Sequence, residues 1–103
     1  MFLLQPLFIA AQEGHTEIVA QLVAAEGVDV NQAENNGATP LFVAAQEGHI
    51  GIVKLLLNDS RVDINKARKP NGVTPVMIAA KKRHAQIEKI ILKNGKTNIC
   101  LAH

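Results

Sequence analysis

The sequence predicts an all-α repeat fold, a solenoid of stacked helix–turn–helix units. Residues 5–35, beginning QPLFIAAQEGH, align without gaps on residues 39–69, beginning TPLFVAAQEGH, with 16 of 31 positions identical. The pattern returns from Thr74 as TPVMIAAKKRH, after one added residue near Pro70. Self-similarity at a period of 20–50 residues is typical of repeat architectures. We therefore interpret residues 1–103 as one domain with repeats at approximately 5–35, 39–69 and 74–103.

The start of each repeat predicts a first helix. Thr39–Pro40 and Thr74–Pro75 place a good N-capping residue before a proline. Proline suits the first helical position, because the N–H that it lacks has no partner within the helix. Each helix is centred on a pair of alanines, whose small side chains allow neighbouring backbones to approach closely. The alanine pairs are Ala10–Ala11, Ala44–Ala45 and Ala79–Ala80.

Glycine is expected to end the first helix in two of the three repeats. Gly14 and Gly48 can adopt the left-handed conformation that closes a helix. Arg83 occupies the same position in the third repeat. A non-glycine residue pays about 1–2 kcal/mol in that conformation, so the third turn should be strained or altered.

Apolar residues spaced along one helical face predict a second helix in each repeat. Because this helix is bulky and the first is rich in alanine, we expect a curved stack with the short first helices on its concave side. Asn36–Gly37 and Asn71–Gly72 lie between repeats and predict tight turns of the β-hairpin type, which would form projecting fingers. The apolar positions of the second helices are Ile18, Val19, Leu22, Val23, Ile52, Val53, Leu56 and Leu57.

Composition narrows the class of protein. Hydrophobic residues make up 48% of the chain and aromatic residues 3%, so the core must be built from aliphatic side chains. A single cysteine, Cys100, excludes an internal disulfide and a cysteine-based zinc cluster, and fits the cytoplasm or nucleus. No apolar run approaches the roughly 20 residues that span a bilayer. The apolar start, Met1 to Ala11, lacks the basic residues that begin a signal peptide.

Charge is divided unequally along the chain. Residues 1–50 contain six acidic residues and no lysine or arginine, which gives a formal charge of −6. Residues 51–103 contain eleven basic and three acidic residues, which gives +8. The molecule should therefore be an electrical dipole from its first repeat to its last.

The repeat reads T-P-L-x-x-A-A-x-x-G-H, followed by I-V-x-x-L and V-D-[VI]-N, and this pattern resembles the ankyrin family over nearly the whole chain. Phe8, Phe42 and Met77 stand where the family usually has histidine, so we expect apolar packing there. The resemblance implies an ankyrin-repeat solenoid with β-hairpin fingers. It also implies a non-catalytic protein–protein interaction module, a scaffold or adaptor.

The resemblance further implies where a protein partner would bind. Partners of ankyrin proteins typically contact the fingers and the exposed positions of the short first helices. The matching positions are Gln12, Glu13, Asn35, Asn36, Ala38, Gln46, Glu47, Arg68, Lys69, Asn71, Val73, Lys81 and Lys82. This surface changes from acidic to basic, so the partner should carry the complementary gradient. Asn65 and Asn31 resemble positions that asparaginyl hydroxylases modify in ankyrin proteins.

No residues predict catalysis, a cofactor or a metal. His15, His49 and His84 share one repeat position, so stacking should hold them apart in a row, whereas zinc needs converging ligands. Asp29 and Asp63 are expected to form loops by bonding their own backbone. We therefore expect neither an enzyme nor a small-molecule substrate.

Two other functions stay open. The acidic first repeat of one molecule could meet the basic last repeat of another, which would give end-to-end self-association, although we expect a monomer. Nucleic acid could bind the basic cluster of the third repeat, but aromatic residues for base stacking are lacking and the acidic half would repel phosphates. The cluster comprises Arg68, Lys69, Lys81, Lys82 and Arg83.

The ends of the stack raise the question of capping. Terminal repeats need a polar outer face. Gln21 replaces the Leu55 of the middle repeat, and Glu88 replaces its Val53, which favours a capped array. The apolar residues 1–4 favour the opposite: they could fold over the first repeat or mark the edge of a longer one.

Overall fold

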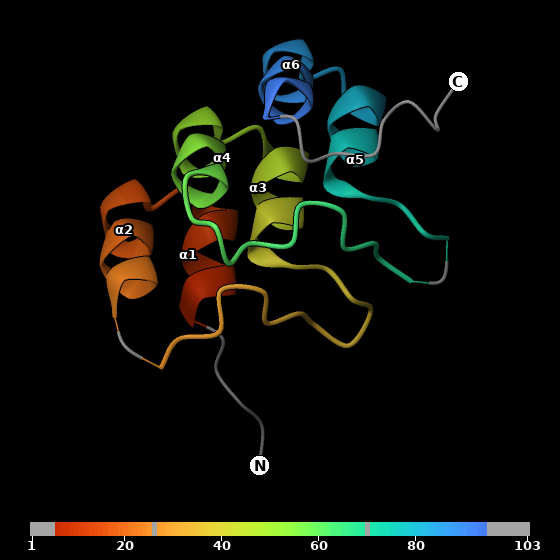
Figure 1. Cartoon of the computed structure of the whole chain (residues 1–103). Helices are drawn as coiled ribbons and strands as arrows, with labels where there is room; N and C mark the ends of the chain where they lie inside the picture. Colours follow the sequence, from red (N-terminus) through yellow and green to blue (C-terminus); the bar gives the residue numbers. More distant parts are fainter. Residues whose placement is uncertain (1–5, 26, 70, 95–103) are drawn as a thin grey trace.

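The computed structural model describes residues 6–25, 27–69 and 71–94, and within them it has six α-helices in three pairs. The first helices α1, α3 and α5 form one row, the second helices α2, α4 and α6 form another, and the loops between pairs project to one side (Figure 1). The all-α repeat fold is thus confirmed. The helices are α1 (Pro6–Glu13), α2 (Thr16–Ala24), α3 (Pro40–Glu47), α4 (Ile50–Leu57), α5 (Pro75–Lys81) and α6 (Ala85–Lys93).

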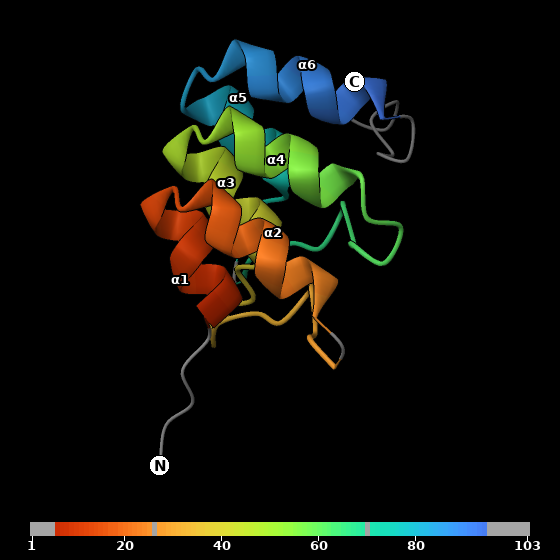
Figure 2. The same cartoon turned by 90° about the vertical axis from the view of Figure 1, so that its left-hand side faces the viewer.

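The three pairs stack in chain order, with α1 and α2 at one end and α5 and α6 at the other (Figure 2). The first helices have seven or eight residues and the second helices eight or nine, so their lengths are nearly equal. The curvature of the stack stays a prediction. Cys100, residues 1–4 and Pro70 lie outside the described residues.

The predicted helix starts are confirmed in the second and third repeats. The hydroxyl oxygen of Thr39 accepts a hydrogen bond of 3.2 Å from the backbone N–H of Phe42. Thr74 accepts one of 3.4 Å from the N–H of Met77. Each threonine precedes a proline at the first helical position, so the local sequence is sufficient to begin the helix there.

The predicted helix ends are confirmed as well. Gly14 and Gly48 have φ angles of 82° and 81°. Arg83 has a φ of 64° and is the one non-glycine residue of the described chain with a positive φ. The third repeat therefore keeps the same turn and places an arginine in a conformation that favours glycine.

The core is aliphatic and is densest in the middle repeat. Ala44 and Ala45 have no exposed surface, because α3 lies between α1 and α5 and their backbones approach closely. Phe42, Ile52 and Leu56 are also fully buried. Phe8 and Phe42 replace the family's histidine by apolar packing, as expected, but Met77 is exposed, so that prediction is wrong in the third repeat.

The fingers turn at the predicted glycines, but the predicted β-hairpin geometry is not confirmed in the described residues. Gly37 and Gly72 have φ angles of 88° and 71°, but Asn36 and Asn71 lack the positive φ that an Asn-Gly turn of the hairpin type requires. The described residues contain no strand; Arg68 and Val73 form an isolated antiparallel bridge. The β-hairpin finger is therefore not confirmed.

The loops that follow the second helices are joined by side chains. The amide of Asn31 accepts a 2.7 Å hydrogen bond from the N–H of Asp63 and donates one of 2.8 Å to the carbonyl oxygen of Arg61. Arg61 in turn donates to the carbonyl oxygen of Val23 at 2.8 Å, near the end of α2. Three hydrogen bonds thus connect the first repeat with the loop of the second.

The aspartates act locally, as predicted. Oδ1 of Asp29 accepts from the N–H of Asn31 at 3.0 Å, and Oδ1 of Asp63 accepts from the N–H of Asn65 at 3.1 Å. Both carboxylates therefore shape their own loops.

Candidate protein-binding surface

The last turn of each first helix presents two polar side chains at the same two repeat positions. In the first two repeats these are a glutamine and a glutamate, and in the third they are two lysines. All are exposed except Gln46, which is half-buried. Because α1, α3 and α5 pack side by side, the six residues form two short parallel rows. The rows comprise Gln12, Gln46 and Lys81, and Glu13, Glu47 and Lys82.

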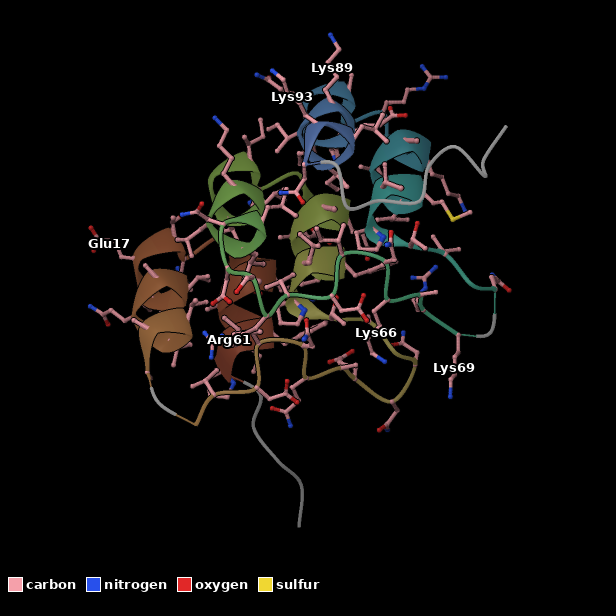
Figure 3. The ribbon with its side chains drawn as sticks, in the orientation of Figure 1. Glu17, Arg61, Lys66, Lys69, Lys89 and Lys93 are labelled. Atoms are coloured by element: carbon pink, nitrogen blue, oxygen red, sulfur yellow. The ribbon has the colours of Figure 1, made fainter. Side chains whose placement is uncertain are left out.

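The fingers add a second strip of polar side chains. Asn35, Asn36, Lys69 and Asn71 are exposed. The N–H of Lys69 donates a 2.6 Å hydrogen bond to the carbonyl oxygen of Asn36, which ties the second finger to the first. The side chain of Lys69 points away from the helices, as does that of the neighbouring Lys66 (Figure 3).

Two of the residues that the sequence assigns to the binding surface expose little of their side chains to solvent. Ala38 is 5% exposed, so it cannot offer the contact expected of it, and Val73 is half-buried against the core. Both directly precede the threonine that begins a first helix, where the chain turns from the finger into the stack. Burial at this point was not apparent from the repeat pattern, because the pattern does not show on which side a turn closes.

The side chain of Arg68, which the sequence assigns to the binding surface, packs against another residue of the protein. Its guanidinium carbon lies 4.8 Å from the centroid of the Phe42 ring, a cation–π geometry, and the residue is half-buried. Phe42 belongs to α3 and Arg68 to the following finger, so this contact fixes the finger against the helix. The sequence had no signal for it, because the two residues are distant in the chain.

Charge changes sign from one end of the stack to the other. Glu17 extends from α2 at the first repeat, whereas Lys89 and Lys93 extend from α6 at the last (Figure 3). The rows on the first helices follow the same direction, from Glu13 to Lys82. The dipole seen in the sequence is therefore also a dipole in space.

The three histidines lie in a row and two of them bind the preceding repeat. Nε2 of His49 is 3.0 Å from the carbonyl oxygen of Gln12, and Nε2 of His84 is 3.1 Å from that of Gln46. Each of these imidazoles joins two repeats. No group of three His, Cys, Asp or Glu residues able to hold a metal occurs in the part of the chain that the structure describes.

The two asparagines proposed for hydroxylation have different surroundings. Asn65 is exposed. Asn31 is half-buried, and its amide already joins the loops of the first two repeats. Modification at either position stays a proposal.

Taken with the stacked helix pairs, these features define a helical repeat protein that presents polar side chains on its fingers and first helices. A family model described as ankyrin repeats, in three copies, matches residues 7–101. The chain belongs to the ankyrin-repeat family. Ankyrin repeats are generally protein–protein interaction modules and are typically non-enzymatic.

A search of curated proteins finds none that matches this chain. Within the described residues, no helix has the length and apolar character needed to cross a membrane.

Proposed function

We propose that this chain is a non-catalytic adaptor that binds a protein partner through what we call the finger–helix surface. This surface comprises Gln12, Glu13, Asn35, Asn36, Gln46, Glu47, Lys69, Asn71, Lys81 and Lys82. The observation that supports it is the pair of parallel rows on the first helices. Five of the six side chains are exposed, and the helices that carry them pack against one another, so little backbone order would be lost on binding.

Charge suggests how the partner would be oriented. The surface is acidic at Glu13 and Glu47 and basic at Lys69, Lys81 and Lys82. A partner with a basic segment facing the first two repeats and an acidic segment facing the third would be favoured. Such complementarity chiefly sets orientation and association rate, and salt weakens it.

Affinity capture from the native source tests this proposal. The Glu47→Lys, Lys82→Glu double variant exchanges one charge of each sign on the finger–helix surface and keeps the net charge. A Glu17→Lys, Lys89→Glu variant makes the same exchange on the second helices and serves as the control. We expect the first variant to lose a partner that the wild type and the control both retain. Equal recovery by all three would refute the finger–helix surface as the site.

The alternatives have tests of their own. Light scattering that shows a monomer at every concentration would exclude end-to-end self-association. For nucleic acid, the described aromatic residues offer no stacking platform, since Phe8 and Phe42 are both buried. Filter binding at low salt would detect the cluster of Lys81, Lys82 and Arg83 acting on phosphates. We propose the cytoplasm or nucleus as the site of action.

A further inference from the structure

Apolar side chains at the outer side of the first repeat are exposed, whereas the equivalent side chains in the later repeats are buried. In the second and third repeats, one apolar position of the second helix is fully shielded: Ile52 is 0% exposed and Ile87 is 1% exposed. Ile18 occupies the same position in the first repeat and is 48% exposed. The residue type is the same in all three repeats, so the difference comes from the preceding repeat, which the first one lacks in the described structure.

The first helices show the same difference. Val43 and Ile78 are buried, whereas the equivalent Ile9 is 46% exposed. Pro40 is fully buried and Pro6 is exposed. The first repeat therefore presents, at its outer side, positions that the other repeats bury.

A hollow of about 300 Å³ opens on the first repeat. It lies between the start of α1, the end of α2 and the loop that follows, and Pro6 and Leu22 are among its lining residues. The equivalents of these two in the middle repeat, Pro40 and Leu56, are fully buried. The hollow thus coincides with positions that are filled elsewhere in the stack.

His15 is a further residue of the first repeat that is exposed where its equivalent contacts the preceding repeat. His49 lies against Gly14 of the preceding repeat, close enough that a Cβ built on Gly14 would be 2.9 Å from Cε1 of the imidazole. His49 also pairs with the carbonyl oxygen of Gln12. His15 has the same position and is exposed. The first repeat therefore carries the histidine with which a repeat binds the one before it.

Among the described residues, the third repeat does not carry the complementary surface. Arg83 replaces the glycine on which the next histidine would lie. Glu88 replaces Val19 and Val53, both of which are fully buried. Both replacements disfavour stacking of a second copy of this chain on the third repeat in the register of the internal repeats.

The polar residues expected to cap the two ends have different surroundings. Glu88 is half-buried at the third repeat, and Gln21 is exposed at the first. Gln21 leaves Ile9 and Ile18 exposed on the same repeat. The capped array stays a prediction.

We propose that the first repeat docks a further ankyrin-type unit, stacked in tandem on what we call the amino-terminal face: Pro6, Ile9, His15, Ile18 and Leu22. Continuity with the two internal interfaces supports this occupant. The occupant must end its first helix in glycine, offer a free carbonyl two residues before that glycine, and carry a small aliphatic residue at the position of Val19. This inference does not depend on the finger–helix surface.

A tandem chain tests the proposal: residues 1–38 followed directly by residues 5–103, which adds one copy of the first repeat before the existing one. The added copy supplies Gly14, the Gln12 carbonyl and Val19 to the amino-terminal face. Repeat proteins gain stability with each matched interface. We expect one urea transition at a higher midpoint, with an m-value larger by roughly a third, in proportion to the added surface. The matched control carries Gly14→Arg in the added copy only, and should lose the gain in midpoint.

Ile18→Gln, made in the original first repeat, provides the second readout. In the natural chain the side chain is half exposed, so the urea midpoint should change little. In the tandem chain the same substitution should lower the midpoint clearly. An unchanged midpoint in the tandem chain would overturn the proposal. So would an equal drop in both chains, since another segment, such as residues 1–4, would then already cover the face. Partner capture by the finger–helix surface is a separate measurement, so the two proposals can fail independently.

Discussion

The imidazole of His84 lies directly on Gly48. A Cβ atom built on Gly48 would be 3.0 Å from Cε1 of His84, tighter than nine in ten real Cβ contacts. Gly48 also has a φ of 81°. This glycine therefore serves two purposes: it closes α3, and it leaves room for the histidine that binds the next repeat.

These two purposes can be separated by substitution. Gly48→Ala should lower the free energy of unfolding by more than the cost of φ alone, because the histidine must also move. Gly27→Ala is the control: Gly27 has the same φ of 81° and nothing within 4 Å of its Cβ position, so about 1–2 kcal/mol is expected there. Urea unfolding measures both. Equal losses would show that the histidine contact adds nothing.

Arg83→Gly should stabilise the protein. The substitution relieves a positive φ of 64° in a turn that keeps its hydrogen bond, 2.8 Å from the N–H of His84 to the carbonyl oxygen of Ala79. Part of the gain is offset by the greater freedom of glycine in the unfolded chain, which leaves up to about 1 kcal/mol. Thermal unfolding should show a midpoint higher by a few degrees. Lys82→Gly, at a φ of −86°, should lower the midpoint instead. An unchanged or lower midpoint for Arg83→Gly would contradict the claim that the positive φ of Arg83 destabilises the folded protein.

Asn31→Ala should weaken the connection between the first two repeats. It removes two hydrogen bonds, to Asp63 and Arg61, and leaves their backbone groups without these partners. A loss of about 1–3 kcal/mol is expected in the free energy of unfolding. Asn35→Ala, on the exposed finger, should change stability by less than about 0.5 kcal/mol. Similar losses for both variants would show that the bridge contributes little.

Acid should weaken the ion pair that supports Arg61. The side-chain hydrogen bond from Arg61 to Asp59, together with the bond from the Arg61 N–H, lowers the pKa of Asp59 from 3.8 to about 2. A carboxylate whose pKa is lower in the folded state stabilises it above the unfolded pKa, and that stabilisation is lost as pH falls towards the folded pKa. The difference in unfolding free energy between wild type and Asp59→Asn should therefore be constant above about pH 5 and shrink between pH 4 and 2. A difference that persists unchanged to pH 2 would contradict this role.

Local features were predictable because neighbouring residues determine them. A threonine before a proline begins a helix through its own hydroxyl group, and a glycine ends one because it lacks a Cβ. Both operate within a few residues, so Thr39 and Gly48 behave as their sequence indicates. The same reasoning anticipated the unusual backbone of Arg83.

The surface was less predictable, because exposure depends on what lies beside a residue in space. The pattern correctly indicated that Glu13, Glu47 and Lys82 would lie in one exposed row, since they share a helical position. It did not indicate that Ala38 is buried. It also gave no sign that Arg68 is held over the ring of Phe42.

By itself, the sequence determined the number of units, where their first helices begin and end, and the direction of the charge gradient. Each of these follows from short-range stereochemistry or from counting charges. The tertiary structure decided which of the equivalent apolar positions in the three repeats are buried. Ile18 and Ile52 are the same residue in the same motif, yet one is half exposed and the other fully buried. Burial of an apolar side chain depends on the neighbour that excludes water from it, and only stacking supplies that neighbour.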